Sequence, residues 1–125
     1  MKQAKIIQAY KVLNNISQQK LPLSVSYKLW TIARMLQPQW EFQKSEEAKV
    51  IEKYNPVMND DGSMSLGSEE RAKECKAEYE KTVAEIAEMD IDLGEFKKVA
   101  LHLDDNIDIS IVEIEALSEF VDFVE

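Results

Sequence analysis

Hydrophobic residues recur at steps of three and four along the first third of the chain. Between Lys2 and Ser17 they form one stripe, made of Ile6, Ala9, Tyr10, Leu13 and Ile16. A connection at residues 18–23 follows, because Pro22 disfavours helical angles at the residue before it. The next stripe consists of Val25, Leu29, Ile32 and Leu36. Such spacing is typical of amphipathic helices, so two are predicted, the second capped by Ser24 or Ser26.

Pro38 falls inside the continuation of the second helix. A proline there removes one backbone hydrogen bond and clashes with the preceding turn, at a cost of about 3 kcal/mol. The helix therefore either bends near Arg34 or stops and restarts with Pro38 in its first turn. The bend is favoured, because the residues up to Tyr54 are rich in helix formers. Their thinner apolar edge predicts a protruding arm that ends at Asn55-Pro56.

A third helix is predicted from Ser68 to Met89. Ser68 is suited to cap its first turn, where acidic residues are also favourable. One face carries Ala72, Cys75, Tyr79, Val83 and Ile86. Two long helices joined by residues 55–67 are expected to pack antiparallel, because neither can bury its stripe alone.

Beyond Asp90 the hydrophobic period changes to two, which is typical of strands. The alternating positions are Ile91 and Leu93, then Val99, Leu101 and Leu103, then Ile107 and Ile109. The final stretch is "SIVEIEALSEFVDFV", in which Ser110 and Glu113 match a reciprocal capping box. A closing helix is predicted, with Ile114, Leu117, Phe120, Val121 and Val124 on its apolar face.

The predicted fold is therefore α+β and mainly α. It combines an N-terminal helix, a long antiparallel helical hairpin, short C-terminal β segments and a closing helix. No repeat, linker or low-complexity run divides the chain, so residues 1–125 are expected to form a single domain. A chain of this length can bury about two-thirds of the surface that it exposes when unfolded.

Charge is distributed unevenly along the chain, whose net charge is −9. Residues 1–59 hold 9 Lys+Arg and 4 Asp+Glu, a net of +5, whereas residues 60–125 hold 6 and 20, a net of −14. The acidic total argues against direct nucleic-acid binding and allows a basic protein partner. In the alternative, the two halves neutralise each other within the fold or an oligomer. No stretch has the length and apolarity of a membrane span, and the lone Cys75 suggests a reducing, intracellular setting.

The acidic stretch "NDDGSMSLGSEE" raises the question of a calcium site. If Gly62 were the sixth residue of a calcium loop, Val57 would be the first and Ser68 the twelfth. Valine cannot bind the ion, and serine cannot supply the two oxygens of the usual glutamate. A tight turn around Gly62 is predicted instead.

Catalytic chemistry has no clear basis in the sequence. His102, the only histidine, is placed on the polar side of a strand, and Cys75 lies on an apolar stripe as a buried core residue. Neither belongs to a nucleophile–base–orienter set. No catalytic residue, metal site or cofactor is predicted, and an enzyme using carboxylates with a divalent ion is the least favoured class.

Three segments stand out by their order and spacing: "LNNISQQKLPLSVSYKLW", "EKYNPVMNDDGS" and "ISIVEIEALSEFVDFVE". They resemble a small family of uncharacterised proteins encoded by phages and prophages of Gram-positive bacteria. The sequence departs from the family pattern at Pro38, where an uninterrupted helix is expected. The resemblance implies a phage context, with expression in the host cytoplasm during infection or from a prophage, and the virion as a further location. It transfers no site residues.

The leading hypothesis is a non-enzymatic phage accessory protein that acts by protein contact, as an assembly helper or as an inhibitor of a host protein. Trp40 and Phe42, near the bend, are candidate apolar anchors, since aromatic residues dominate interface energetics. In the alternative they are core or dimer-seam residues.

Two other functions stay open. The first is an acidic nucleic-acid mimic that occupies a DNA- or RNA-binding site. Glu78, Glu85 and Glu119 are candidate partner-binding carboxylates, as Trp40 and Phe42 are candidate apolar anchors. Four basic residues interrupt the first acidic helix, which weakens this hypothesis: Arg71, Lys73, Lys76 and Lys81. The second is a structural homo-oligomer that completes the apolar edge between Trp40 and Tyr54 with another copy.

Overall fold

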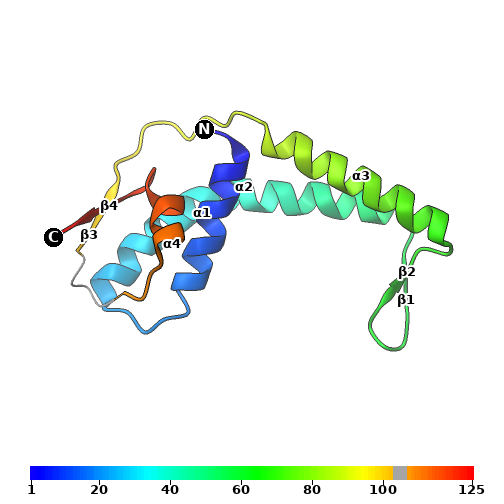
Figure 1. Cartoon of the computed structure of the whole chain (residues 1–125), viewed down its shortest axis with the longest axis horizontal. Coiled ribbons are helices and arrows are strands. Elements are labelled where there is room, and N and C mark those ends of the chain that lie inside the picture. The colour runs from blue at the N-terminus through cyan, green and yellow to red at the C-terminus, as the bar shows by residue number, and fades with distance from the viewer. Residues whose placement is uncertain (103–106) are drawn as a thin grey trace.

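The computed structural model describes residues 1–102 and 107–125, which form a body and an arm (Figure 1). The body comprises α1 (Gln3–Ile16), the first part of α2 (Leu23–Lys53), β3 (Val99–His102), α4 (Ile111–Leu117) and β4 (Val121–Val124). The arm comprises the rest of α2, β1 (Val57–Met58), β2 (Met64–Ser65) and α3 (Glu69–Ala87). The predicted α+β, mainly α class is confirmed.

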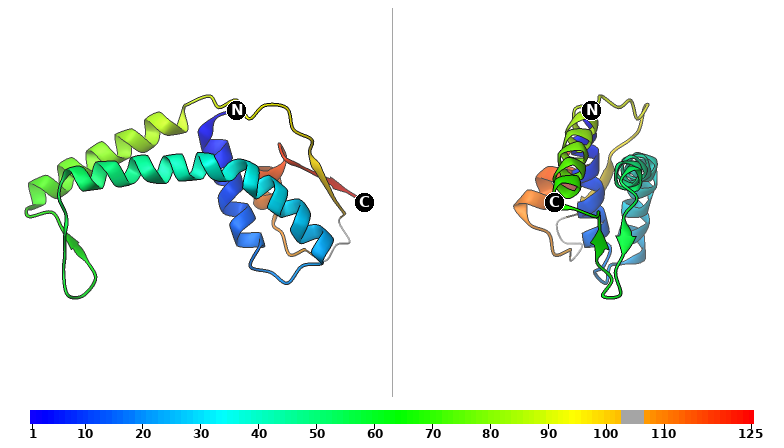
Figure 2. Two further views of the ribbon diagram at one scale, coloured as in Figure 1. Left: turned by 180° about the vertical axis from the view of Figure 1, so that it is seen from behind. Right: turned by 90° about the vertical axis from the view of Figure 1, so that its right-hand side faces the viewer.

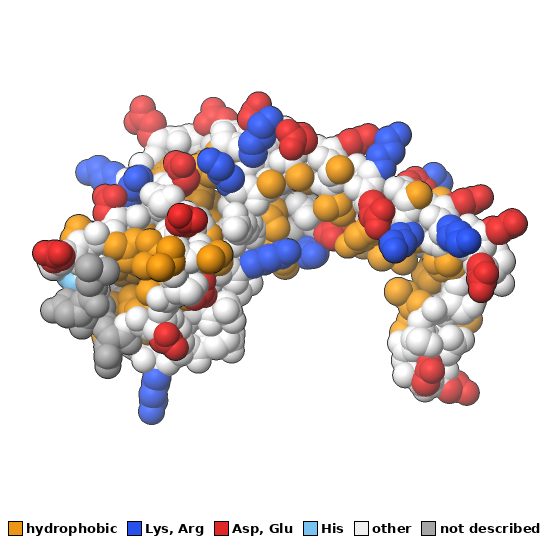
Figure 3. All heavy atoms as spheres, in the orientation of Figure 1, with side chains coloured by type: hydrophobic (Ala, Val, Ile, Leu, Met, Phe, Trp, Pro, Cys, Tyr) orange, Lys and Arg blue, Asp and Glu red, His pale blue; other side chains and the backbone are white. Residues whose placement is uncertain are grey.

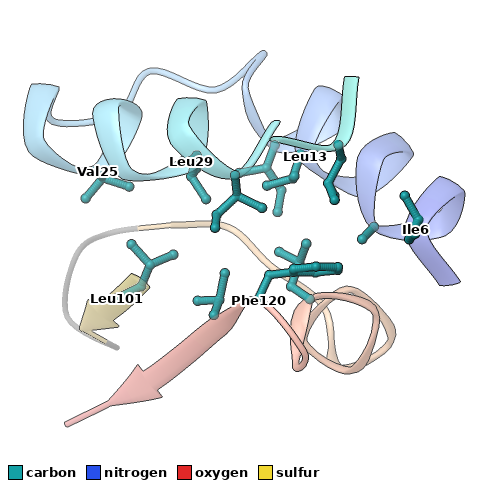
Figure 4. Packing of buried hydrophobic residues seen from close by; sticks show 12 residues of the cluster. Ile6, Leu13, Val25, Leu29, Leu101 and Phe120 are labelled. Atoms are coloured by element: carbon teal, nitrogen blue, oxygen red, sulfur yellow. The ribbon is translucent and has the colours of Figure 1, made fainter. Parts of the chain in front are cut away.

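The core of the body lies between two layers. Figure 4 shows Val25 and Leu29 of α2 on one side of the core, and Leu101 of β3 and Phe120 on the other. Phe120, which is 1% exposed, stacks on Phe96 with ring centroids 5.5 Å apart. The predicted stripes of the first two helices supply most of the remaining core: Ile6, Ala9, Leu13, Ile16, Ile32 and Leu36.

The second helix is continuous through Pro38 and changes direction along its length, as Figure 2 shows. The favoured bend is therefore confirmed. The expected serine cap is wrong, because the helix begins at Leu23 and its N-cap is Pro22, without a side-chain cap. Pro22 has a φ of −55° and a ψ of 147°, so its fixed φ fits the non-helical conformation of an N-cap. The Pro22 carbonyl accepts the N–H of Ser26 at 3.0 Å.

The arm is the predicted antiparallel hairpin of helices, with a small β-hairpin at its far end (Figure 1). Ser68 caps α3 as expected, since its side chain accepts the N–H of Arg71. In the β-hairpin, Val57 pairs with Ser65 and Met58 with Met64. Gly62 has a φ of +86° in the connecting turn, a conformation that glycine adopts without strain.

The end of the chain corrects the predicted closing helix. The Ser110–Glu113 capping box is present, but α4 ends at Leu117, and Val121–Val124 forms a strand parallel to β3. Alternation in "VDFV" satisfies a strand as well as a helix face, and β3 needs a hydrogen-bonding neighbour.

The other predicted strands are only partly present. Val99 and Leu101 lie in β3, but Ile91, Leu93, Ile107 and Ile109 lie in no strand. Asp90 forms an isolated bridge with Lys2, and Gly94 then turns the chain with a φ of +73°. Leu103 lies outside the described residues.

Candidate protein-contact surfaces

A buried polar contact joins the two helices of the arm. The Tyr79 hydroxyl donates a hydrogen bond to the Glu47 carboxylate, whose side chain is 8% exposed. Lys44 Nζ lies 3.2 Å from the other carboxylate oxygen, close enough for an ion pair although outside hydrogen-bond geometry. The bond to Glu47 raises the pKa of Tyr79. These groups hold the arm together and are not free for a partner.

A second polar network closes the arm where α2 ends. Lys53 Nζ donates to one Glu78 oxygen at 2.8 Å, and the Tyr54 hydroxyl donates to the other at 2.7 Å. Lys53 and Tyr54 together lower the pKa of Glu78, and the bond to Glu78 raises the pKa of Tyr54 to about 12. Arg71 donates to the Tyr54 carbonyl at 2.6 Å. Glu78 therefore already has partners within the chain.

Beside this network lies an apolar hollow of about 340 Å³, here called the tip hollow. Its apolar lining comes from α2, α3 and the segment between them: Ile51, Met64, Leu66, Ala72, Cys75 and Tyr79. The adjoining β-hairpin exposes Val57 at 64%, Met58 at 64% and Met64 at 54%. Figure 3 shows hydrophobic side chains gathered over this end of the arm. The tip hollow and the hairpin together form an apolar surface with no cover among the described residues.

A second surface follows the outer side of α2 in the body. It consists of Leu23, Tyr27, Trp30 and Arg34, here called the aromatic stripe. The first three are 86%, 63% and 51% exposed. The rings of Tyr27 and Trp30 lie 5.8 Å apart, and the Arg34 guanidinium lies 5.2 Å from the centre of the Trp30 ring. The positions recur at steps of four, three and four, so they form a second stripe opposite the buried one. Sequence reasoning missed this surface, although the spacing was its signal.

The predicted anchors near the bend have different environments. Trp40 is half-buried, with its ring 5.1 Å from that of Tyr10 and Lys44 Nζ 4.6 Å above it. Its ring therefore packs on Tyr10 of α1. Phe42 is 40% exposed. The two aromatic residues therefore lie in different environments.

The predicted carboxylates do not form one face. Glu85 is exposed on α3 and forms no ion pair with the described residues. Glu119 lies in the turn after α4, in the body, with its carboxylate 3.9 Å from Lys5 Nζ. Glu78 is held at the end of the arm. These three groups belong to separate parts of the molecule.

The side chains that could take part in catalysis or metal binding also lie far apart. Cys75 is buried in the arm as predicted, whereas His102 is exposed on β3, at the opposite end of the molecule (Figure 1). Within residues 1–102 and 107–125, no group of three or more His, Cys, Asp or Glu side chains could hold a metal ion. None of the described helices combines the length and apolarity needed to cross a membrane.

The chain matches no protein-family model, no curated protein and no solved structure.

Proposed function

We propose that this chain is a non-enzymatic phage accessory protein that acts by protein contact, with the end of its arm as the contact surface. The observation that carries the proposal is the apolar hairpin beside the tip hollow, held away from the body by the paired helices of α2 and α3. Covering apolar surface is favourable by about 25 cal/mol per Å². Exposed Val57, Met58 and Met64 are therefore suitable for burial by a partner.

The hairpin has a second property that suits binding. A lone two-stranded hairpin is at best marginally stable in water. Here β1 pairs only with β2, so each strand keeps one open edge among the described residues. An extended segment of a partner can pair along such an edge while its side chains enter the tip hollow. The partner class that fits is a protein with an exposed apolar strand or short extended segment.

The phage context of the proposal comes from the sequence motifs that resemble phage and prophage proteins. Within that context, an assembly helper and an inhibitor of a host protein both act by contact. The corresponding location is the host cytoplasm during infection or prophage expression, with the virion as the alternative. Identifying the partner distinguishes these roles, because a virion component would indicate an assembly helper and a host enzyme would indicate an inhibitor.

The nucleic-acid mimic receives less support. Mimicry of phosphates needs free carboxylates along one face, whereas Glu78 is bound by Lys53 and Tyr54, and Glu119 lies close to Lys5. The remaining carboxylates of α3 alternate with lysines. Their fields partly cancel at the distance of a partner.

The test is capture of partners from infected cells with the tagged chain, followed by mass identification. Met58→Asp places a charge on the exposed hairpin and should remove the specific partner. Met89→Asp is a matched control, because Met89 is 41% exposed and lies beyond the end of α3, away from the tip hollow. The proposal fails if Met58→Asp retains every partner that the wild type and the control hold, or if the wild type captures none.

A further inference from the structure

The two layers of the body come from sequence segments of opposite charge. Residues 1–40 contain six Lys and Arg and no Asp or Glu, whereas residues 99–125 contain eight Asp and Glu and no Lys or Arg. The first segment supplies α1 and the first part of α2. The second supplies β3, α4 and β4. One layer is therefore basic and the other acidic.

Pairing inside the chain neutralises only part of this charge. Lys2 lies 3.5 Å from Glu88, and Lys5 lies 3.9 Å from Glu119. By contrast, Lys20 and Arg34 of the basic layer form no ion pair with the described residues. The same is true of Asp108 and Glu115 in the acidic layer. Uncompensated charge of both signs is left on the outside of the body.

Each layer also has exposed apolar side chains on its outer surface. On the basic layer they belong to the aromatic stripe, in which Tyr27 and Trp30 lie beside Arg34. On the acidic layer they lie on the outer face of α4, where Ile111 is 78% and Val112 is 67% exposed beside Glu115. We call these three residues the α4 face. Both surfaces therefore combine exposed apolar side chains with charge, but the charges have opposite signs.

The two surfaces lie on opposite sides of the body. The aromatic stripe is on the side of α2 opposite Leu29 and Ile32, and the α4 face is on the side of α4 opposite Leu117, by the helical period. In Figure 1 α4 faces the viewer, whereas in the left view of Figure 2, seen from behind, the first part of α2 does. The two surfaces of one molecule therefore cannot contact each other.

We infer that a second copy of this chain docks its α4 face on the aromatic stripe. Charge selects this pairing over the two symmetric ones. Stripe against stripe sets two basic surfaces, each with Arg34, against each other, and α4 face against α4 face sets two acidic surfaces, each with Glu115, against each other, so each symmetric pairing opposes surfaces of like charge. Only the head-to-tail pairing matches basic with acidic while covering apolar side chains on both copies.

Head-to-tail contact leaves each end copy with one uncovered surface. The association therefore continues into a ring or an open filament instead of stopping at a two-fold dimer. The contact uses the body alone and leaves the tip hollow and the β-hairpin uncovered. It is a function additional to the partner binding proposed for the arm.

A charge-exchange experiment tests the inference by sedimentation velocity at low salt. The wild type should increase in mass with concentration, and salt should weaken the association because the contact is partly ionic. Arg34→Glu gives a chain with acidic groups on both surfaces, and Glu115→Lys gives one with basic groups on both. Each variant alone should associate about tenfold or more weakly than the wild type, the change that 1.4 kcal/mol produces. Mixing the two variants should restore assembly, because each then meets a surface of opposite charge.

Four results would overturn the inference. The first three are a wild type that remains monomeric at low salt, variants that assemble alone like the wild type, and a mixture of the variants that does not recover assembly. The fourth is a mass that stops at two copies, because it indicates a symmetric contact. Circular dichroism of each variant checks that the exposed substitutions leave the fold intact. Met58→Asp should assemble like the wild type. Partner capture therefore reports on the arm and sedimentation reports on self-association, so either proposal can fail without the other.

Discussion

The hydroxyl of Tyr79 on α3 donates a hydrogen bond to the buried carboxylate of Glu47 on α2. Tyr79→Phe removes this donor and leaves the carboxylate with Lys44 alone. A buried polar group without its partner costs about 1–3 kcal/mol, so the free energy of unfolding should fall by that amount. Urea denaturation measures the change.

The double variant Tyr79→Phe/Glu47→Met separates the hydrogen bond from simple packing. Methionine fills similar space without a group that needs a partner, so most of the lost stability should return. A double variant less stable than Tyr79→Phe would mean that Glu47 stabilises the arm mainly through Lys44.

Glu78 should make the arm less stable at acid pH. Lys53 and Tyr54 lower the pKa of Glu78, so its ionised form stabilises the fold at neutral pH. This stabilisation is complete above the ordinary glutamate pKa of 4.5 and is lost as pH falls through the lower value of the folded state. Glu78→Gln should therefore flatten the decrease in thermal midpoint at acid pH. Glu85→Gln should leave the slope of the wild type, because Glu85 is exposed and forms no ion pair with the described residues.

Tyr54 should be among the last phenols to ionise. Its bond to Glu78 raises its pKa from 10.0 to about 12, which favours the neutral phenol in the folded state. The corresponding stabilisation is complete below pH 10 and disappears as pH rises through about 12. Ultraviolet absorbance titration of phenolate should lose a late-ionising component in Tyr54→Phe. Tyr79, whose pKa is also raised by its bond to Glu47, keeps its own late ionisation in this variant. If Tyr54→Phe loses no late-ionising phenol relative to the wild type, the hydrogen bond to Glu78 is absent in solution.

Trp40 and Phe42 should respond differently to truncation. Trp40 packs against Tyr10, so Trp40→Ala should lower the free energy of unfolding by about 2–3 kcal/mol, less than for a fully buried aromatic residue. Phe42 is 40% exposed, and Phe42→Ala should cost about 0.5 kcal/mol, as at other surface positions. Chemical denaturation of both variants compares them. Equal losses would show that the two residues share one environment.

Sequence patterns predicted several features that are set locally, although the serine cap expected for α2 is not among them. The stripe of α1, the Ser68 cap, the Ser110–Glu113 box and the turn at Gly62 depend on residues close together in the chain, and all are present. The strand at Val121–Val124 was not predicted, because its apolar positions also fit a helix face. Its pairing with β3 joins segments that are distant in the sequence.

The candidate surfaces were less predictable than the fold. Trp40 and Phe42 are adjacent to the same bend, yet only the packing of α1 shows that Trp40 is half-buried. Glu78 looks like a free carboxylate on an acidic helix until Lys53 and Tyr54 are brought beside it from α2. The aromatic stripe was accessible to helical periodicity, because its four members share one face of α2.

The continuity of α2 from body to arm fixes a distance as well as a direction. Each helical residue advances the chain by 1.5 Å, so the part of α2 beyond Pro38 reaches about 20 Å. A partner bound at the β-hairpin would therefore be kept at a fixed distance from the body. Copies joined through their bodies would present the ends of their arms at regular intervals.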